Sequence, residues 1–291
     1  MLPPIIRLLR PTHWVKNLVV LAGGFFGIRL FDASAMGPAI LAFLAFCAGS
    51  SGVYVINDLV DLTRDRAHPV KCRRPLAAGE VKIATAHASA TVLLIGGAVL
   101  AFLVNTSVGW CLVGYLTLNM AYTAGLKHVA FVDVFIIGLG FVARVLAGTF
   151  AAAVAPTIWI VICTFLLAIL LGFSKRRTEL ATLAGSLRTE QRPVLAAYSL
   201  PMLDCGLRIT AGITVLIYAL FATLAHGNLW WWITVLPVAA GLWRYLQLIA
   251  RENTGRSPEL FLFSDRWLQG TILIWVVLCF VVRYQPGLFH G

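Results

Sequence analysis

The chain is poor in charged residues and has no closely spaced pair of cysteines. Only 12% of its 291 residues are Asp, Glu, Lys or Arg, about half the share of a soluble globular protein. Its six cysteines are scattered, which argues against a zinc site or a secreted disulfide scaffold. No basic stretch is interleaved with aromatic residues, so the excess of cations does not indicate a nucleic-acid partner. With 60% hydrophobic residues and a mean hydropathy of +0.88, the composition indicates a polytopic membrane protein.

Long runs without charge predict where the chain crosses the membrane, because a spanning helix needs about 20 mostly apolar residues. We assign one span to 33–57, two each to 83–126, 134–174 and 209–243, and one each to 14–31 and 268–286. The paired spans are expected to be divided by a turn at 105–107, a break at Pro156 and a turn near 226–228. Lipid offers the backbone no hydrogen-bond partners, so these spans are expected to be helices. The sequence thus predicts an all-α bundle of nine transmembrane helices, forming a single domain over residues 1–291.

The distribution of Lys and Arg predicts the orientation of these spans. With the N-terminus inside, 18 of the 23 cations lie on the cytoplasmic side and only Arg29 and Arg283 lie outside. This bias favours a cytoplasmic N-terminus in the inner membrane. The cytoplasmic loops lie at about 58–82, 122–133, 174–192 and 251–267. Because they also carry most of the acidic residues, we expect the active site at the cytoplasmic face.

The first cytoplasmic loop carries three closely spaced acids. Asp58, Asp61 and Asp65 are spaced i, i+3 and i+7, so they would share one face of a helix. Three like charges at a membrane surface favour a bound cation, and oxygen ligands select Mg²⁺, with Mn²⁺ as a second option. The cations that follow are Arg64, Arg66, Lys71, Arg73 and Arg74. Carboxylates beside cations suit a diphosphate; the alternative is a solvated loop of mutual salt bridges.

The pattern Asn57-Asp58-x-x-Asp61-x-x-x-Asp65 at a helix end resembles the first signature of the UbiA superfamily of intramembrane prenyltransferases. The resemblance covers nearly the whole chain, and it implies that the three acids are catalytic and hold Mg²⁺. Aromatic prenyltransferases of this superfamily carry a second motif, Asp-x-x-x-Asp, after the sixth span. Here the segment 175–180 reads Lys-Arg-Arg-Thr-Glu-Leu instead. Cations at this place suit a substrate with a further phosphate; the alternative is a helix end in which they pair with Glu179.

Further stretches resemble the decaprenyl-phosphate phosphoribosyltransferase branch of the superfamily. They are Arg10-Pro11-x-x-Trp14-x-Lys16-Asn17, Tyr122-x-x-x-Leu126-Lys127-His128, Gly140-Phe141-x-x-Arg144, Lys175-Arg176-x-x-Glu179, and Ser257-Pro258-Glu259 with Ser264-Asp265-Arg266. The resemblance implies Mg²⁺-dependent transfer of 5-phosphoribose from phosphoribosyl diphosphate to a polyprenyl phosphate. In mycobacteria and their relatives this step leads to the arabinose donor of the cell wall.

These patterns predict a set of substrate-binding residues. It comprises Lys16, Asn17, Asn57, Arg64, Lys71, Arg73, Arg74, Tyr122, Lys127, His128, Asp133, Arg144, Lys175, Arg176, Glu179, Asp265 and Arg266. Arg144 lies inside a span, where a cation is costly and indicates function by default; an internal Asp partner is the alternative. Lys175 and Arg176 are expected to bind the 5-phosphate.

Two other functions stay open at this stage. An aromatic prenyltransferase would share the fold and the first acidic motif, but not the cationic segment at 175–180. A transporter would place its charged residues near the membrane midplane, whereas here they gather at one face. The expected partners are the two substrates and membrane lipids, with a homo-oligomer left open and no nucleic acid.

Overall fold

The computed structural model describes residues 2–26, 32–182, 193–225, 229–252 and 258–284. Every regular element among these residues is a helix, which confirms the all-α prediction. The helices form two compact units, and the single domain over residues 1–291 stays a prediction. Unit 1 comprises Met1–Ala124 and Leu139–Pro156, and unit 2 comprises Gly125–Gly138 and Thr157–Gly291. Helix α7 (Val132–Ala151) contributes to both units.

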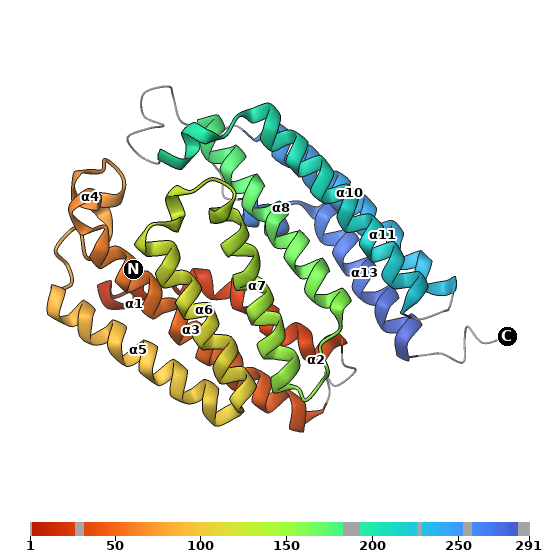
Figure 1. The fold of residues 1–291 in the computed structure, drawn as a ribbon, viewed down its shortest axis with the longest axis horizontal. Helices are drawn as coiled ribbons and strands as arrows, with labels where there is room; N and C mark the ends of the chain where they lie inside the picture. The colour runs from red at the N-terminus through yellow and green to blue at the C-terminus, as the bar shows by residue number, and fades with distance from the viewer. Residues whose placement is uncertain (1, 27–31, 183–192, 226–228, 253–257, 285–291) are drawn as a thin grey trace. The chain divides into compact units, whose positions relative to one another are not determined.

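Unit 1 is built around α3, which packs along α5 (Figure 1). Its elements are α1 (Pro4–Leu9), η1 (Pro11–Leu21), α2 (Ala22–Phe26), α3 (Ala33–Val60), α4 (Leu62–Ala67), η2 (Lys71–Arg73), α5 (Ile83–Val104) and α6 (Thr106–Ala124). Small residues bring α3 and α5 together, because a Cβ on Gly97 would lie 3.0 Å from the Ala45 carbonyl oxygen. The core between α3, α6 and α7 contains Phe46, Leu112 and Tyr115.

The segment η1 is a 3₁₀-helix of 11 residues, and such helices are usually shorter. Its backbone touches α7, since a Cβ on Gly148 would lie only 1.7 Å from the Val20 carbonyl oxygen. The side chain of Asn17 is fully buried and donates a hydrogen bond to Ser50 Oγ at 3.1 Å. These contacts fix η1 against α3 and α7.

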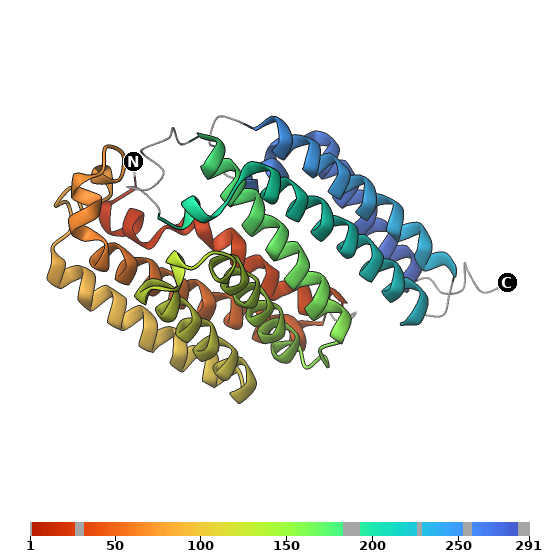
Figure 2. The ribbon, with the colours of Figure 1, turned by 45° about the horizontal axis from the view of Figure 1, so that its top comes forward.

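Unit 2 contains the remaining helices, with α8 packed along α10 and α11 along α13 (Figure 2). Its elements are η3 (Leu126–His128), α8 (Ile158–Thr182), η4 (Pro193–Ala197), α10 (Leu200–Leu224), η5 (Leu229–Thr234), α11 (Val235–Arg251), η6 (Pro258–Leu260), α12 (Phe261–Ser264) and α13 (Arg266–Tyr284). Leu170, Leu207, Tyr245 and Ile249 contribute to its core.

Among the described residues, six helices are long and apolar enough to cross a membrane, so the chain is a multi-pass membrane protein. They are Ala33–Val60, Ile83–Val104, Val132–Ala151, Ile158–Thr182, Leu200–Leu224 and Trp230–Arg251, with Arg266–Val282 as a shorter apolar helix. The predicted count of nine is not confirmed. Within the run 14–31, the described residues 14–26 belong to η1 and α2, and α6 is not among the six. The run 83–126 breaks at Asn105 as predicted, where the side chain accepts a hydrogen bond from the Val108 N–H at 2.8 Å. The expected turn at 226–228 lies outside the described residues.

Candidate active site

Two aspartates and two arginines of unit 1 form a compact network, the Asp58 cluster, made of Arg10, Asp58, Asp65 and Arg74. Arg74 Nη1 lies 3.1 Å from Asp58 Oδ1 and 2.6 Å from Asp65 Oδ2, so one guanidinium nitrogen bridges both carboxylates. Arg10 Nη2 forms a second ion pair with Asp58 Oδ1. The aspartates are almost fully buried, at 3% and 2% exposed. Each of the two buried carboxylates therefore forms an ion pair with at least one guanidinium.

The helical spacing of the three acids is interrupted at Asp61. Helix α3 ends at Val60, and Asp61 adopts φ −88° and ψ 5° before α4 begins at Leu62. Asp58 and Asp65 still come together through Arg74, but the three carboxylates do not lie on one continuous helix. Among the described residues, no group of three or more His, Cys, Asp and Glu side chains converges to hold a metal. The structure brings Asp58 and Asp65 together through Arg74, and the roles of all three acids remain predictions.

Arg74 extends from a firmly anchored turn. Pro75 keeps Arg74 in extended conformation, with ψ 142°. Leu76 is 1% exposed in a core cluster with Leu8 and Val55. Gly79 closes the turn with φ +77°, which glycine adopts without strain. The backbone at Arg74 is fixed, whereas its side chain is 31% exposed.

The other predicted residues of this loop are close in sequence to Asp58, Asp65 and Arg74. Asn57 Oδ1 accepts a hydrogen bond from the Thr123 hydroxyl, which ties α3 to α6. Arg64 and Arg73 are exposed and Lys71 is half-buried. Exposed or half-buried cations beside buried carboxylates are suited to an anionic ligand that arrives from water.

Arg144 of α7 is buried, yet none of its hydrogen-bond acceptors is acidic. Its guanidinium donates to Asn17 Oδ1 at 2.7 Å, to the Gly140 carbonyl at 2.8 Å and to the Tyr115 hydroxyl at 3.0 Å. It also lies 4.4 Å from the centroid of the Tyr115 ring and 5.4 Å from that of Phe141. Cation–π contacts of this kind stabilise a desolvated guanidinium. Neutral partners therefore hold Arg144, in place of the acidic partner considered from the sequence.

Unit 2 contains a second ionic network, the Asp133 cluster, made of Asp133, Arg176, Glu179 and Tyr198. Asp133 and Arg176 are fully buried, with Arg176 Nε 2.6 Å from Asp133 Oδ2. Arg176 Nη1 lies 2.5 Å from Glu179 Oε2, which is the helix-end pairing considered from the sequence. Tyr198 donates to Asp133 Oδ1 at 2.8 Å, and burial raises its pKa, so this phenol stays protonated at neutral pH. Arg176, expected to bind a phosphate, is held by two carboxylates.

Arg177 was not predicted as a site residue, and the structure gives it a role in packing. Its Nε donates to Asp204 Oδ1 at 2.6 Å, and its Nη1 donates to the Ile249 carbonyl at 2.7 Å. Its Nη2 donates to the Ala250 carbonyl at 3.3 Å. These carbonyls belong to the C-terminal turn of α11, where a cation is favoured by unsatisfied oxygens and by the helix dipole. Arg177 thus joins α8, α10 and α11.

Asp265 begins α13, and its side chain is already paired. Its Oδ2 lies 2.7 Å from Arg244 Nη2, and its Oδ1 accepts the Leu268 N–H at 2.8 Å. The hydrogen bond from Arg244 lowers the pKa of Asp265. Arg266, the next predicted residue, is exposed. Asp265 therefore acts as a helix cap.

The remaining predicted residues lie on helices of the two units. Lys16 and Tyr122, in unit 1, are half-buried. In unit 2, Lys127 and Lys175 are half-buried and His128 is exposed. Sequence reasoning missed Arg10 as a site residue, although Arg10-Pro11 and Arg74-Pro75 share the Arg–Pro dipeptide.

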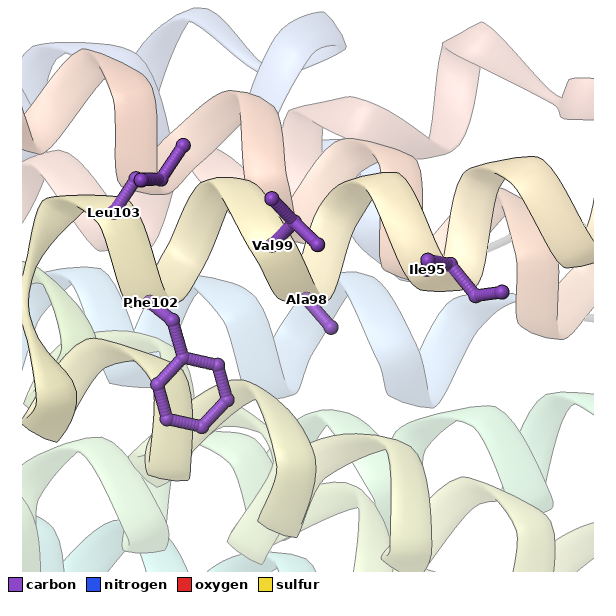
Figure 3. Close-up of a pocket in the computed structure, with 5 residues that line it drawn as sticks. All are labelled: Ile95, Ala98, Val99, Phe102 and Leu103. Atoms are coloured by element: carbon purple, nitrogen blue, oxygen red, sulfur yellow. The ribbon is translucent and has the colours of Figure 1, made fainter.

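A shallow groove on α5 contains none of this charged chemistry. Ile95, Ala98, Val99, Phe102 and Leu103 line it along one stretch of the helix (Figure 3). Its lining is wholly apolar, so it suits hydrocarbon and offers nothing to a phosphate.

The apolar helices define a multi-pass membrane protein that contains two ionic networks. A family model described as the UbiA prenyltransferase family matches residues 17–268. This chain belongs to the UbiA prenyltransferase family, and it is a transferase.

Named relatives cover nearly all of the chain. A decaprenyl-phosphate phosphoribosyltransferase of Mycolicibacterium smegmatis is 31% identical, over 94% of this chain and 90% of that protein. One from Corynebacterium glutamicum is also 31% identical, over 98% of this chain and 88% of that protein. Among solved structures, a UbiA homolog from Archaeoglobus fulgidus bound to DMAPP and Mg²⁺ superposes with a TM-score of 0.74. It is 21% identical over 95% of this chain and 98% of that chain, which confirms the UbiA fold.

Proposed function

We propose that the protein transfers 5-phosphoribose from phosphoribosyl diphosphate to a polyprenyl phosphate and releases diphosphate. The observation that carries the proposal is the Asp58 cluster, in which buried carboxylates and guanidiniums occupy one place. Relatives named decaprenyl-phosphate phosphoribosyltransferase, alike over nearly the whole chain, support the choice of substrates.

Asp58 and Asp65 would hold the divalent metal. Their oxygens already share one cationic nitrogen, and an oxygen donor set favours Mg²⁺ or Mn²⁺. Two carboxylates plus substrate phosphates are the usual ligands of Mg²⁺ in proteins. We retain Asp61 as a further ligand of the metal or of its water. When bound, Mg²⁺ would supply Lewis-acid stabilisation of the leaving diphosphate.

The cations of the same loop would bind the diphosphate itself. Arg74 and Arg10 lie against the carboxylates, with Arg64, Lys71 and Arg73 close in sequence. Guanidiniums form strong paired hydrogen bonds to phosphate oxygens. They would offset the charge that develops as the bond between ribose C1 and the diphosphate oxygen breaks.

The acceptor needs no general base, because a lipid phosphate is already ionised at neutral pH. One of its oxygens forms the new bond to C1 as the electron pair of the old bond leaves with the diphosphate. We propose that Lys16 contacts the lipid phosphate. Asn17 and Arg144, which are buried and bonded to each other, would hold the segment that carries Lys16.

For unit 2 we propose that Lys175 binds the 5-phosphate. The fully buried pair of Asp133 and Arg176 would fix the turn of α8 that bears Lys175. Tyr122, Lys127, His128, Glu179, Asp265 and Arg266 complete the proposed substrate-binding set.

We further propose that the protein lies in the cytoplasmic membrane with its N-terminus and active site inside. Its product would supply the pentose of an arabinose donor for cell-wall assembly. The polyprenyl tail would lie among the apolar helix faces in contact with lipid.

A donor swap on purified protein with Mg²⁺ tests the proposed reaction. One sample contains labelled phosphoribosyl diphosphate and decaprenyl phosphate; the other contains a polyprenyl diphosphate and 4-hydroxybenzoate. We expect label in the lipid fraction of the first sample alone. A prenylated aromatic product in the second sample alone would identify an aromatic prenyltransferase. If neither labelled lipid nor prenylated aromatic product forms, both reactions are refuted.

A further inference from the structure

The place between Asp58 and Asp65 is held by a cation of the chain itself. Arg74 Nη1 contacts one oxygen of each carboxylate, at 3.1 and 2.6 Å. A divalent ion held by these two aspartates would draw on carboxylate charge that Arg74 already offsets. The guanidinium of Arg74 and the metal would therefore compete for the same two carboxylates.

The charge balance of the Asp58 cluster disfavours a free metal ion. Two carboxylates face two guanidiniums, Arg10 and Arg74, so the cluster is neutral. A Mg²⁺ ion that entered alone would leave an excess of positive charge in a largely buried place. A diphosphate would bring the missing negative charge, together with oxygens that can accept hydrogen bonds from Arg74.

Of the two arginines, Arg74 is the one free to change its contacts. Its backbone is fixed by the turn around the buried Leu76, whereas its side chain is 31% exposed. Arg10 is further constrained, since its guanidinium lies 5.1 Å from the centroid of the Tyr54 ring. The Arg74 side chain can therefore swing from carboxylate to phosphate without a movement of the loop.

We propose that Arg74 is an internal counter-ion that excludes free divalent cations from Asp58 and Asp65 and yields to the metal only when a diphosphate arrives. This inference rests on the part of the proposed function that brings metal and diphosphate to these two aspartates. It makes tight metal binding dependent on the diphosphate, and it gives Arg74 contacts to two successive partners.

Binding of Mn²⁺ to the whole protein in detergent, followed by electron paramagnetic resonance, tests the proposal without turnover. Arg74→Gln removes the competing charge, and Arg66→Gln is the matched control, because Arg66 is an exposed cation of the same loop. Without any phosphate ligand, we expect Arg74→Gln to bind Mn²⁺ about tenfold more tightly than the wild type. Arg66→Gln should match the wild type. Equal affinities in Arg74→Gln and the wild type would overturn the proposal.

A second measurement needs only the wild-type protein and the charge-preserving Arg74→Lys variant. Inorganic pyrophosphate should tighten Mn²⁺ binding by the wild type about tenfold or more, measured against a protein-free blank. Arg74→Lys should keep the weak binding of free Mn²⁺. Wild-type affinity that is the same with and without pyrophosphate would overturn the proposal, even if Arg74→Gln does not fold.

The donor-swap assay separates this inference from the proposed function. Phosphoribosyl transfer by the wild type, with no gain of Mn²⁺ affinity in Arg74→Gln, would refute the counter-ion role alone. A gain of affinity in that variant without phosphoribosyl transfer would refute the proposed reaction and support the counter-ion role of Arg74.

Discussion

The buried ion pair between Asp133 and Arg176 gives a quantitative prediction for Asp133→Asn. Both side chains are fully buried, with Arg176 Nε 2.6 Å from Asp133 Oδ2. Removing one member of such a pair leaves an uncompensated charge and costs about 3–5 kcal/mol. Because Arg176 keeps Glu179 as a partner at 2.5 Å, we expect the lower end, about 3 kcal/mol. The substituted amide can still accept the Tyr198 hydrogen bond, so the loss reports mainly on charge.

Glu179→Gln is the matched control, because it removes the other carboxylate of Arg176. This carboxylate is 25% exposed, and a partly solvated pair contributes about 1 kcal/mol or less. Unfolding by SDS in mixed micelles, followed by far-ultraviolet circular dichroism, gives the free energy of unfolding for each variant. Equal losses in the two variants would contradict the assignment of the main charge balance to Asp133.

The double variant Asp133→Asn with Arg176→Gln tests the same reasoning from the opposite side. It removes both buried charges, and replacing both members of a buried pair costs far less than removing one. We expect it to regain most of the stability lost by Asp133→Asn. A double variant no more stable than the single one would refute the desolvation argument.

Three further predictions concern catalysis, packing and pH. Asp58→Asn should reduce phosphoribosyl transfer to background at saturating Mg²⁺ in the labelled-donor assay; retained turnover would remove its role as a metal ligand. Gly148→Ala should destabilise the protein by about 1–3 kcal/mol, because its Cβ would meet the backbone of η1. Gly96→Ala, with nothing within 4 Å of the added Cβ, should be neutral or stabilising by up to about 1 kcal/mol. Asp265 has a lowered pKa, so its contribution is present above about pH 4 and is lost as the pH falls through its folded-state value. Melting temperatures from pH 3 to 7 should therefore fall more steeply on acidification for the wild type than for Asp265→Asn.

Much of the fold follows from the distribution of charge along the sequence. The uncharged run 33–57 lies within α3, and the run 83–126 gives α5 and α6, divided at Asn105. In the run 14–31, the described residues 14–26 are divided between the 3₁₀-helix η1 and the short helix α2. The backbone of η1 lies against Gly148, and hydropathy does not reveal such a contact.

The candidate site was predictable in its residue types and less so in its geometry. The Asp-rich motif lies where acids and cations form ion pairs in the structure, and the roles of these residues in a site stay predictions. Helix α3 ends before Asp61, and the turn after η2 positions Arg74. Neither feature has a periodic pattern in the sequence from which it could be predicted. The link between Asn17 and Arg144 joins residues 127 positions apart, so only tertiary packing could reveal it.

The buried arginines show why position in a motif does not decide function. A guanidinium has five N–H donors, and burial demands both hydrogen bonds and a balance of charge. The charge of Arg176 is balanced by two carboxylates, and Arg177 meets both demands with Asp204 and the carbonyls at the end of α11. Their charge is therefore offset inside the fold, which suits a structural role. Arg144 is surrounded by neutral acceptors and aromatic rings, so its field is not cancelled by those contacts and favours an anion near η1. The charge of Arg74 is offset by Asp58 and Asp65, which we propose as metal ligands. When a metal replaces Arg74 at these carboxylates, the guanidinium becomes available to bind a phosphate.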